Sequence, residues 1–313
     1  MAPLDKTAET AASPGLTSRQ AMPLLAGVVL MWGANWPVLR MAVGQIGPLG
    51  LAVGRLTIGT TALFLAALVS RQLRWPARRD HAIVFWTGVL QMGAYIALVT
   101  VALQWVPAGR SAILAYTTPL WVVPLARAWL GERLTGRRLA GLALGLAGIA
   151  VLFAPAILAG THPTTPDDKV LIGYGLLLAA SVCWAVNIVQ IRAHLWLASP
   201  LALAPWQTGL ALLLLLPLYV VLEGGRPVHW SPPLVGALAY NGVIGSALAF
   251  WAMTSVNRAL PAVTTSLGTL GVPAVGLIGA AVFLGEPIGF YDIAGLLLVG
   301  AGLALVALSN RKP

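Results

Sequence analysis

Charged residues are scarce in this chain. Of its 313 residues, 19 are Lys or Arg and 9 are Asp or Glu, together 9%. A water-soluble domain carries about 25% charged residues, so a soluble chain of this length would hold roughly 78. The shortage excludes a soluble enzyme and a disordered chain. With 58% hydrophobic residues and a mean hydropathy of +0.86, the sequence predicts a protein of the lipid bilayer.

Cysteine is almost absent as well. The single Cys183 has no partner for an intramolecular disulfide and cannot build a thiolate metal site, and we expect neither a metal nor a cofactor. The net charge is +10, but the basic residues are scattered at the ends of apolar runs and form no basic face interleaved with aromatic residues. We therefore expect no nucleic-acid partner and interpret the charge as a signal of membrane topology.

Long apolar runs fill most of the chain. Each has about 20 residues or slightly more, the length that a tilted helix needs to cross roughly 30 Å of hydrocarbon. The predicted fold class is therefore an all-α polytopic membrane protein with ten transmembrane helices. The expected spans are 22–43, 49–70, 81–105, 107–130, 136–155, 170–191, 199–222, 234–257, 261–284 and 288–308.

The basic residues predict the orientation, because cytoplasmic loops carry the excess of Lys and Arg. Of the 19 basic residues, 14 lie on the side of the amino terminus. The other five lie on the opposite side: Arg40, Arg55, Arg110, Lys169 and Arg226. Both termini are thus expected in the cytoplasm, with a disordered tail at 1–21 and a short tail at 309–313. The linker at 156–169 is expected outside.

The chain contains an internal repeat. At an offset of 152, Trp32 aligns with Trp184 and Asn35 with Asn187. After one short loop difference the offset is 154, and it aligns Gly88 with Gly242, Pro107 with Pro261, Pro119 with Pro273 and Gly131-Glu132 with Gly285-Glu286. The halves are 22–155 and 170–308, each with five spans. Five is odd, so the second half is inverted, an arrangement that places a substrate site between the halves and permits alternating access. A duplication retained only for fold stability is the alternative.

Three short segments carry a family resemblance. Trp32-Gly33-Ala34-Asn35-Trp36, Gly131-Glu132-Arg133 and Gly285-Glu286-Pro287 resemble the EamA family of the drug/metabolite transporter (DMT) superfamily. Within that family the chain is similar to the aromatic amino acid exporters of the YddG type. The resemblance implies two inverted five-helix repeats around a central cavity, in a bacterial inner (plasma) membrane. It also implies export of amino acids and related small metabolites, rather than enzyme activity.

None of the acidic residues lies in the middle of a span, and the four histidines also fall at span ends or in loops. Proton-coupled carriers usually keep a titrating carboxylate or histidine within the membrane. We therefore expect a facilitator without carboxylate proton coupling. The sequence contains neither the catalytic residues of an intramembrane protease, nor a Gly-rich phosphate-binding loop, nor the residues of a channel filter. A multidrug permease of the same fold, carrying hydrophobic or cationic compounds, stays open as an alternative.

Aromatic residues deep in the spans are candidates for substrate binding, because a flat ring can stack on an apolar or aromatic substrate. Trp32 and Trp184 are favoured, since the repeat relates them; Trp121 and Trp251 are further candidates. Packing against other helices or against lipid is the alternative for each of these residues.

Neutral polar side chains in the spans are the other candidates. Asn35 and Asn187 lie three residues after Trp32 and Trp184, on the same helix face. An amide can hold an ammonium or a carboxylate without a buried charge, although an interhelical hydrogen bond is equally consistent. Further candidates at moderate depth are Gln91, Tyr95, Tyr116, Thr117 and Asn241.

Prolines inside the spans suggest moving parts. Pro119 and Pro273 are repeat equivalents in the middle of the fourth and ninth spans, where a proline removes a backbone hydrogen bond and kinks the helix. We expect these two to act as hinges, with Pro124 adding to the first; a static bend is the alternative.

The small-residue pairs Gly141/Gly145 and Gly276/Ala280 predict close helix packing, within one monomer rather than across a dimer. For Arg40, Arg55 and Arg110 on the external side, we expect snorkelling to the lipid headgroups. An electrostatic lining that attracts carboxylates is the alternative.

Overall fold

The computed structural model describes residues 17–132, 134–158, 167–194, 198–260 and 262–309, and these form helices and connections without a strand. The first half contains α1 (Ser18–Ile46), α2 (Pro48–Val69), η1 (Arg78–Asp80), α3 (His81–Trp86), η2 (Thr87–Ala94), α4 (Tyr95–Ala102), α5 (Ala108–Ala115), α6 (Thr118–Leu130) and α7 (Gly136–Leu158). The second contains α8 (Asp167–Ala193), α9 (Pro200–Leu222), α10 (Pro232–Ala239), η3 (Tyr240–Leu248), α11 (Ala249–Ala259), α12 (Ala262–Thr269), α13 (Gly271–Leu284) and α14 (Phe290–Leu308).

Nine helical segments within the described residues are long and apolar enough to cross a membrane. They correspond to nine of the ten expected spans. The expected span 107–130 is instead divided into α5 and α6, which are separated at Tyr116 and Thr117. Most of the expected amino-terminal tail (1–16) and most of the linker (159–166) lie outside the described residues, and α1 begins at Ser18, earlier than the expected boundary at 22.

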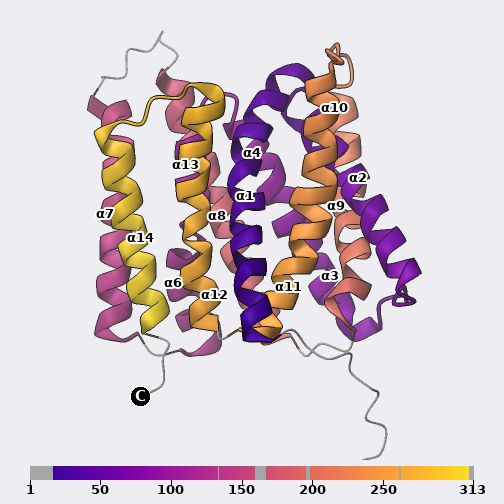
Figure 1. The fold of residues 1–313 in the computed structure, drawn as a ribbon, viewed down its shortest axis with the longest axis horizontal. Coiled ribbons are helices and arrows are strands. Elements are labelled where there is room, and N and C mark those ends of the chain that lie inside the picture. The colour runs from indigo at the N-terminus through magenta and orange to yellow at the C-terminus, as the bar shows by residue number, and fades with distance from the viewer. Residues whose placement is uncertain (1–16, 133, 159–166, 195–197, 261, 310–313) are drawn as a thin grey trace, which may run out of the picture.

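The helices pack side by side, and α1 begins at the same end of the bundle at which α14 ends (Figure 1). We call this end the N-side and the opposite end, where α1 ends and α8 begins, the far side. Because α1 starts at the N-side and α8 at the far side, the two halves run in opposite directions through the bundle. The inversion expected from the odd number of spans per half is therefore seen in the helix directions.

Irregular backbone recurs at matching places in the two halves. The π-helix η2 covers residues 87–94 and the π-helix η3 covers residues 240–248, which coincide at the offset of 154 apart from one residue. The break between α5 and α6 likewise matches the break between α12 and α13. π-helical turns and broken helices frequently mark functional sites. The repeat thus extends to the irregular segments in the middle of the bundle.

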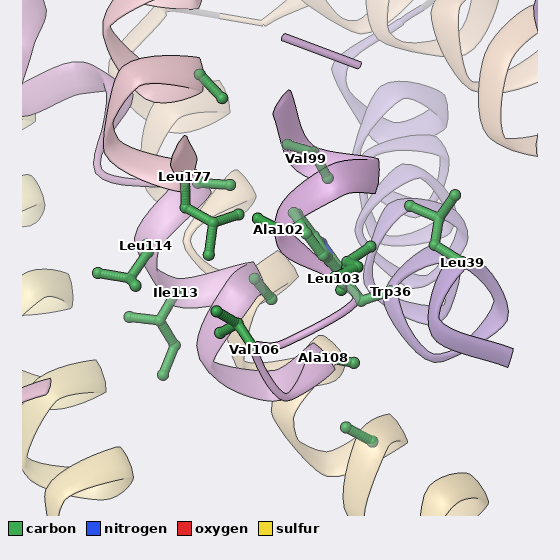
Figure 2. Packing of buried hydrophobic residues seen from close by; sticks show 14 of the residues in the cluster. Trp36, Leu39, Val99, Ala102, Leu103, Val106, Ala108, Ile113, Leu114 and Leu177 are labelled. Carbon is green, nitrogen blue, oxygen red and sulfur yellow. The ribbon is translucent and has the colours of Figure 1, made fainter. Parts of the chain in front are cut away.

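Within the described residues, apolar packing forms four buried clusters. The largest joins residues of both halves, among them Trp36, Ala102, Ile113 and Leu177 (Figure 2). Three smaller clusters join α2 with α4 and α9, α1 with α11, and α6 with α8. The two halves are thus packed against each other by several apolar clusters.

Small residues allow α7 and α14 to approach closely. A Cβ added at Gly302 would lie 2.6 Å from the carbonyl oxygen of Gly141, and one added at Gly145 would lie 2.4 Å from Leu120. Similarly, a Cβ at Gly276 would lie 2.8 Å from Ala112. The two small-residue pairs therefore pack against helices of the same chain, as expected.

Candidate functional site

An aromatic cluster lies where the two halves meet. Trp184 of α8 packs edge to face against Tyr95 of α4, with ring centroids 5.2 Å apart, and against Tyr116 at the break after α5, with centroids 5.9 Å apart. The three side chains are only partly buried, so their rings leave contact surface free. The sequence predicted all three as candidates, and the structure brings them together.

An amide network lies three residues further along α8. Asn187 is fully buried; its Oδ1 accepts a hydrogen bond from Thr87 Oγ1 at 3.0 Å and its Nδ2 donates to Gln91 Oε1 at 2.6 Å. Both partners belong to η2. Asn187 therefore ties the second half to the irregular turn of the first, as the interhelical alternative expected. Thr87 was not among the sequence candidates, although at the offset of 154 it aligns with Asn241.

The break between α5 and α6 is held by hydroxyl groups. Thr117 Oγ1 lies 2.6 Å from the carbonyl oxygen of Leu114, to which it donates, and 2.9 Å from Ser181 Oγ of α8. Trp121 in turn donates its indole N–H to Thr117 Oγ1 at 3.3 Å. Thr117 thus stabilises the break, and its hydroxyl oxygen satisfies the indole N–H of Trp121. Ser181 was not among the residues predicted from the sequence.

The corresponding residues of the first half pack against η3. Trp32 donates its indole N–H to the carbonyl oxygen of Gly245 at 3.1 Å, and Asn35, 8% exposed, lies beside the same glycine. Asn241 is fully buried within η3, with its Nδ2 donating to the carbonyl oxygen of Ala237. Trp32 and Trp184 therefore each contact the opposite half. Trp251 does not join them, because it is 50% exposed on α11.

The prolines expected in mid-helix lie just after the helix breaks. Pro119 is the second residue of α6 and Pro273 the third of α13. Proline is tolerated in a first helical turn, where its missing N–H would have no helical partner. The sequence therefore located the irregularity correctly, but its form is an interruption rather than a bend. Pro124 lies within α6 and is exposed.

None of the three arginines expected to snorkel reaches outward. The Arg40 guanidinium donates to the carbonyl oxygen of Leu103. Arg110 forms an ion pair with Asp292 and donates to the Tyr174 hydroxyl at 2.9 Å. Arg55 donates from Nη2 to Ser246 Oγ of η3 at 3.2 Å. The snorkelling expectation was wrong, because position along a span does not reveal which helix face a residue occupies.

At the far side, two carboxylates hold the start of α5. Glu286 accepts hydrogen bonds from the backbone N–H groups of Ala108 at 2.8 Å and Gly109 at 3.1 Å. Asp292 pairs with Arg110 in the same turn, with Arg110 Nε 2.5 Å from Asp292 Oδ1. A carboxylate at a helix N-terminus is favoured by unpaired N–H groups and by the helix dipole. We call this arrangement the far-side clamp.

The equivalent residues at the N-side are arranged differently. Gly131 and Gly285 end α6 and α13 in the same left-handed conformation, with φ of 67° and 66°, and so present Glu132 and Glu286 alike. At the offset of 154, however, Asp292 aligns with Arg138. Glu132 consequently bonds Arg138 at 2.9 Å and approaches Arg192 at 3.4 Å. A hollow of about 180 Å³ lies beside this group, lined also by Leu270 and Val306.

A second ionisable contact at the N-side joins α8 to the start of the third span. His194 Nε2 lies 2.9 Å from Asp80 Oδ1, and Asp80 is fully buried. Within the described residues, no three His, Cys, Asp or Glu side chains lie close enough to hold a metal ion.

These observations define a polytopic helical membrane protein whose two inverted halves meet around aromatic and amide side chains, with two carboxylates that hold the start of α5 at one end. The chain belongs to the EamA-like transporter family, whose model matches residues 19–154 and 171–308. The two matched ranges correspond to the two halves. The protein is thus a transporter, in accordance with the resemblance.

Relatives align with almost the whole chain. The uncharacterized transporter YvbV of Bacillus subtilis is 28% identical over 288 residues, 92% of either chain. The probable terminal-alkyne amino-acid exporter of Streptantibioticus cattleyicolor is 31% identical over 290 residues, 91% of either chain. The probable amino-acid metabolite efflux pump of Escherichia coli is 25% identical over 289 residues, 88% of this chain and 91% of that one. A crystal structure with 22% identity shares the fold, with a TM-score of 0.64 over 93% of this chain and 97% of that chain.

The far-side clamp leads to a test of Glu286. Hydrogen bonds to a charged group contribute about 1.5–3 kcal/mol each, so Glu286→Gln should weaken the hold on α5 by roughly 1–3 kcal/mol. We expect faster maleimide labelling of a cysteine placed at the buried Val106, in a Cys183→Ala background. Glu132→Gln, the equivalent change at the N-side, is the control and should not raise this rate. Equal labelling rates for all three proteins would show that the clamp does not close the far side.

Proposed function

We propose that this protein exports amino acids, chiefly aromatic and hydrophobic ones, together with related small metabolites. The observation that carries the proposal is the partly exposed cluster of Tyr95, Tyr116 and Trp184 between the two halves. Edge-to-face and stacked rings favour an aromatic or apolar side chain as a further partner. The relatives named amino-acid exporter and amino-acid metabolite efflux pump support the same substrate class.

We infer that transport proceeds by alternating access in a monomer. Glu286 and Asp292 hold the start of α5 at the far side, whereas Glu132 at the N-side pairs with Arg138 beside a hollow of about 180 Å³. A larger hollow of about 670 Å³ lies at the far side, at the end of α1, and is lined by Arg40, Gln104 and Arg226. In the opposite state Glu132 would hold the start of α12, as Glu286 holds α5. Arg110 aligns with Thr264 at the offset of 154, so that closure lacks an ion pair, and the state open to the N-side is favoured without substrate.

The N-side is proposed to face the cytoplasm of a bacterium, with the protein in its inner membrane. The support is the distribution of basic residues, of which 14 of 19 lie on the side of the amino terminus. A transporter that rests open to the cytoplasm receives its cargo there, which suits export.

The acidic side chains support a facilitator rather than a proton-coupled carrier. Asp292 is engaged with Arg110, Asp80 with His194 and Glu223 with the backbone N–H groups of Leu49 and Gly50. All of these lie near the ends of helices, where they stabilise the fold, rather than midway along a span.

Substrate specificity is tested with purified protein in liposomes. We expect saturable uptake and counterflow of phenylalanine, tryptophan and leucine, with slower transport of threonine and of a cationic drug. Trp184→Ala should lower phenylalanine transport about five- to tenfold, the loss of roughly 1–1.5 kcal/mol of aromatic contact. Trp251→Ala removes an exposed indole and serves as the matched control. Drug transport faster than that of every amino acid would favour a multidrug permease, and uptake without counterflow would indicate a channel.

Energy coupling is tested with the same liposomes. At a fixed phenylalanine gradient, collapse of the pH gradient with an ionophore should leave the initial rate unchanged, because no carboxylate in the middle of a span is available to carry a proton. A rate that falls to the background of empty liposomes would contradict the facilitator mechanism.

The hinge role of the helix breaks is tested at Pro119. Pro119→Ala restores a backbone N–H and favours a continuous helix from α5 to α6, so we expect transport to slow several-fold while phenylalanine binding persists. Pro155→Ala changes a proline within α7, away from the breaks, and is the control. If the Pro119→Ala protein transports at the wild-type rate and a cysteine at position 106 is labelled as fast as in the wild type, the break is a static feature.

A further inference from the structure

Three buried polar atoms without a hydrogen-bond partner in the described part of the chain gather around η3. They are Asn35 Oδ1, Arg55 Nε and Asn241 Oδ1. Asn241 belongs to η3 itself, Arg55 bonds Ser246 of η3, and a Cβ built on Gly245 would lie 3.0 Å from Asn35 Oδ1. Buried polar groups in proteins are nearly always paired. Two acceptors and one donor left open at a single place indicate a ligand with groups of both kinds.

The repeat explains why Asn35 Oδ1 lacks a partner. In its equivalent Asn187, Oδ1 accepts a hydrogen bond from Thr87 Oγ1. At the offset of 154, Thr87 aligns with Asn241, whose Nδ2 instead donates to the carbonyl oxygen of Ala237. The position that satisfies the amide oxygen of Asn187 therefore leaves the amide oxygen of Asn35 open.

Arg55 brings an unbalanced positive charge to the same place. It lies seven residues after Pro48, about 10 Å along the α2 axis from the helix start. No carboxylate of the described residues lies within 4.0 Å of its guanidinium, and Tyr95 of the aromatic cluster lies close enough to interact with its charge. A cation held within a bundle is costly and commonly serves function. A guanidinium has five donors suited to a carboxylate.

We propose that the residues around η3 bind the backbone of an α-amino acid, with its carboxylate on Arg55 and its ammonium on the amide oxygens of Asn35 and Asn241. The side chain of the substrate then extends toward Tyr95, Tyr116 and Trp184. This assignment rests on the proposed function and sharpens it, because it makes both charged groups of the substrate necessary. An amine or a carboxylic acid alone would leave one half of the site unpaired.

The test compares four compounds with the same ring in liposomes: phenylalanine, phenylalaninamide, phenethylamine and 3-phenylpropanoate. Wild-type protein should prefer phenylalanine by at least tenfold in transport efficiency over each of the other three, since a site built for a polar group rejects the analogue that lacks it. Arg55→Gln should lower phenylalanine transport at least tenfold and leave phenylalaninamide transport unchanged. Asn35→Leu should remove the preference over 3-phenylpropanoate. Arg226→Gln, which removes an exposed arginine at the far side, is the matched control.

The outcomes separate this inference from the proposed function. Two results overturn the inference alone. One is amino-acid transport without discrimination against phenylalaninamide, and the other is an equal loss of transport for all four compounds in a folded Arg55→Gln protein. Transport of phenethylamine but of no amino acid overturns both. Should Arg55→Gln fail to fold, the wild-type preference decides, because an indifferent wild type excludes a carboxylate site whatever the variant does.

Discussion

Inside a bilayer, every backbone N–H and C=O group needs a partner within the protein, and this constraint determines where the chain departs from regular helix. Irregular backbone at membrane depth is tolerated only where protein or a cavity surrounds it. The break at Tyr116 and Thr117 is accordingly held by hydroxyl contacts with Ser181, and η2 is tied to Asn187. At the break, the Thr117 hydroxyl donates to the carbonyl oxygen of Leu114 and the Thr118 hydroxyl to that of Ala115. The irregular backbone thus lies where polar side chains of the two halves meet.

The two halves share the same architecture, and the differences between them are as informative as the similarities. Gly131 and Gly285 end their helices alike and present Glu132 and Glu286 in the same way. The N-side has Arg138 where the far side has Asp292. Arg138 forms an ion pair with Glu132, whereas Asp292 pairs with Arg110 and helps to hold the start of α5. A symmetric transporter would close equally well at either end. The proposed preference for the state open to the N-side would follow from this one exchanged charge.

Much of the fold and part of the site could be predicted from the sequence. Apolar length predicted the nine segments of the described residues that are long enough to cross a membrane, and the repeat paired Trp32 with Trp184, each of which contacts the opposite half. The fourth expected span could not be foreseen as two helices, because hydropathy does not register a break. Trp251 was misplaced for a related reason: a span that is apolar on every side does not reveal which face turns inward. Arg55 was misjudged likewise, since its depth was readable and its direction was not.

Scarcity of charge has a different meaning at each place where a charge remains. Carboxylates at helix ends, such as Glu223 and Glu286, complete hydrogen bonds that the backbone cannot make within its own helix. They stabilise the fold and need no substrate. The Arg55 guanidinium lies deeper and donates a hydrogen bond to the neutral hydroxyl of Ser246, with no carboxylate of the described residues within 4.0 Å. A buried cation is costly unless a counter-charge lies near it. The carboxylate of a zwitterionic substrate would supply that counter-charge, and only while the substrate is bound. Under the proposed assignment, the same unbalanced charge selects the substrate.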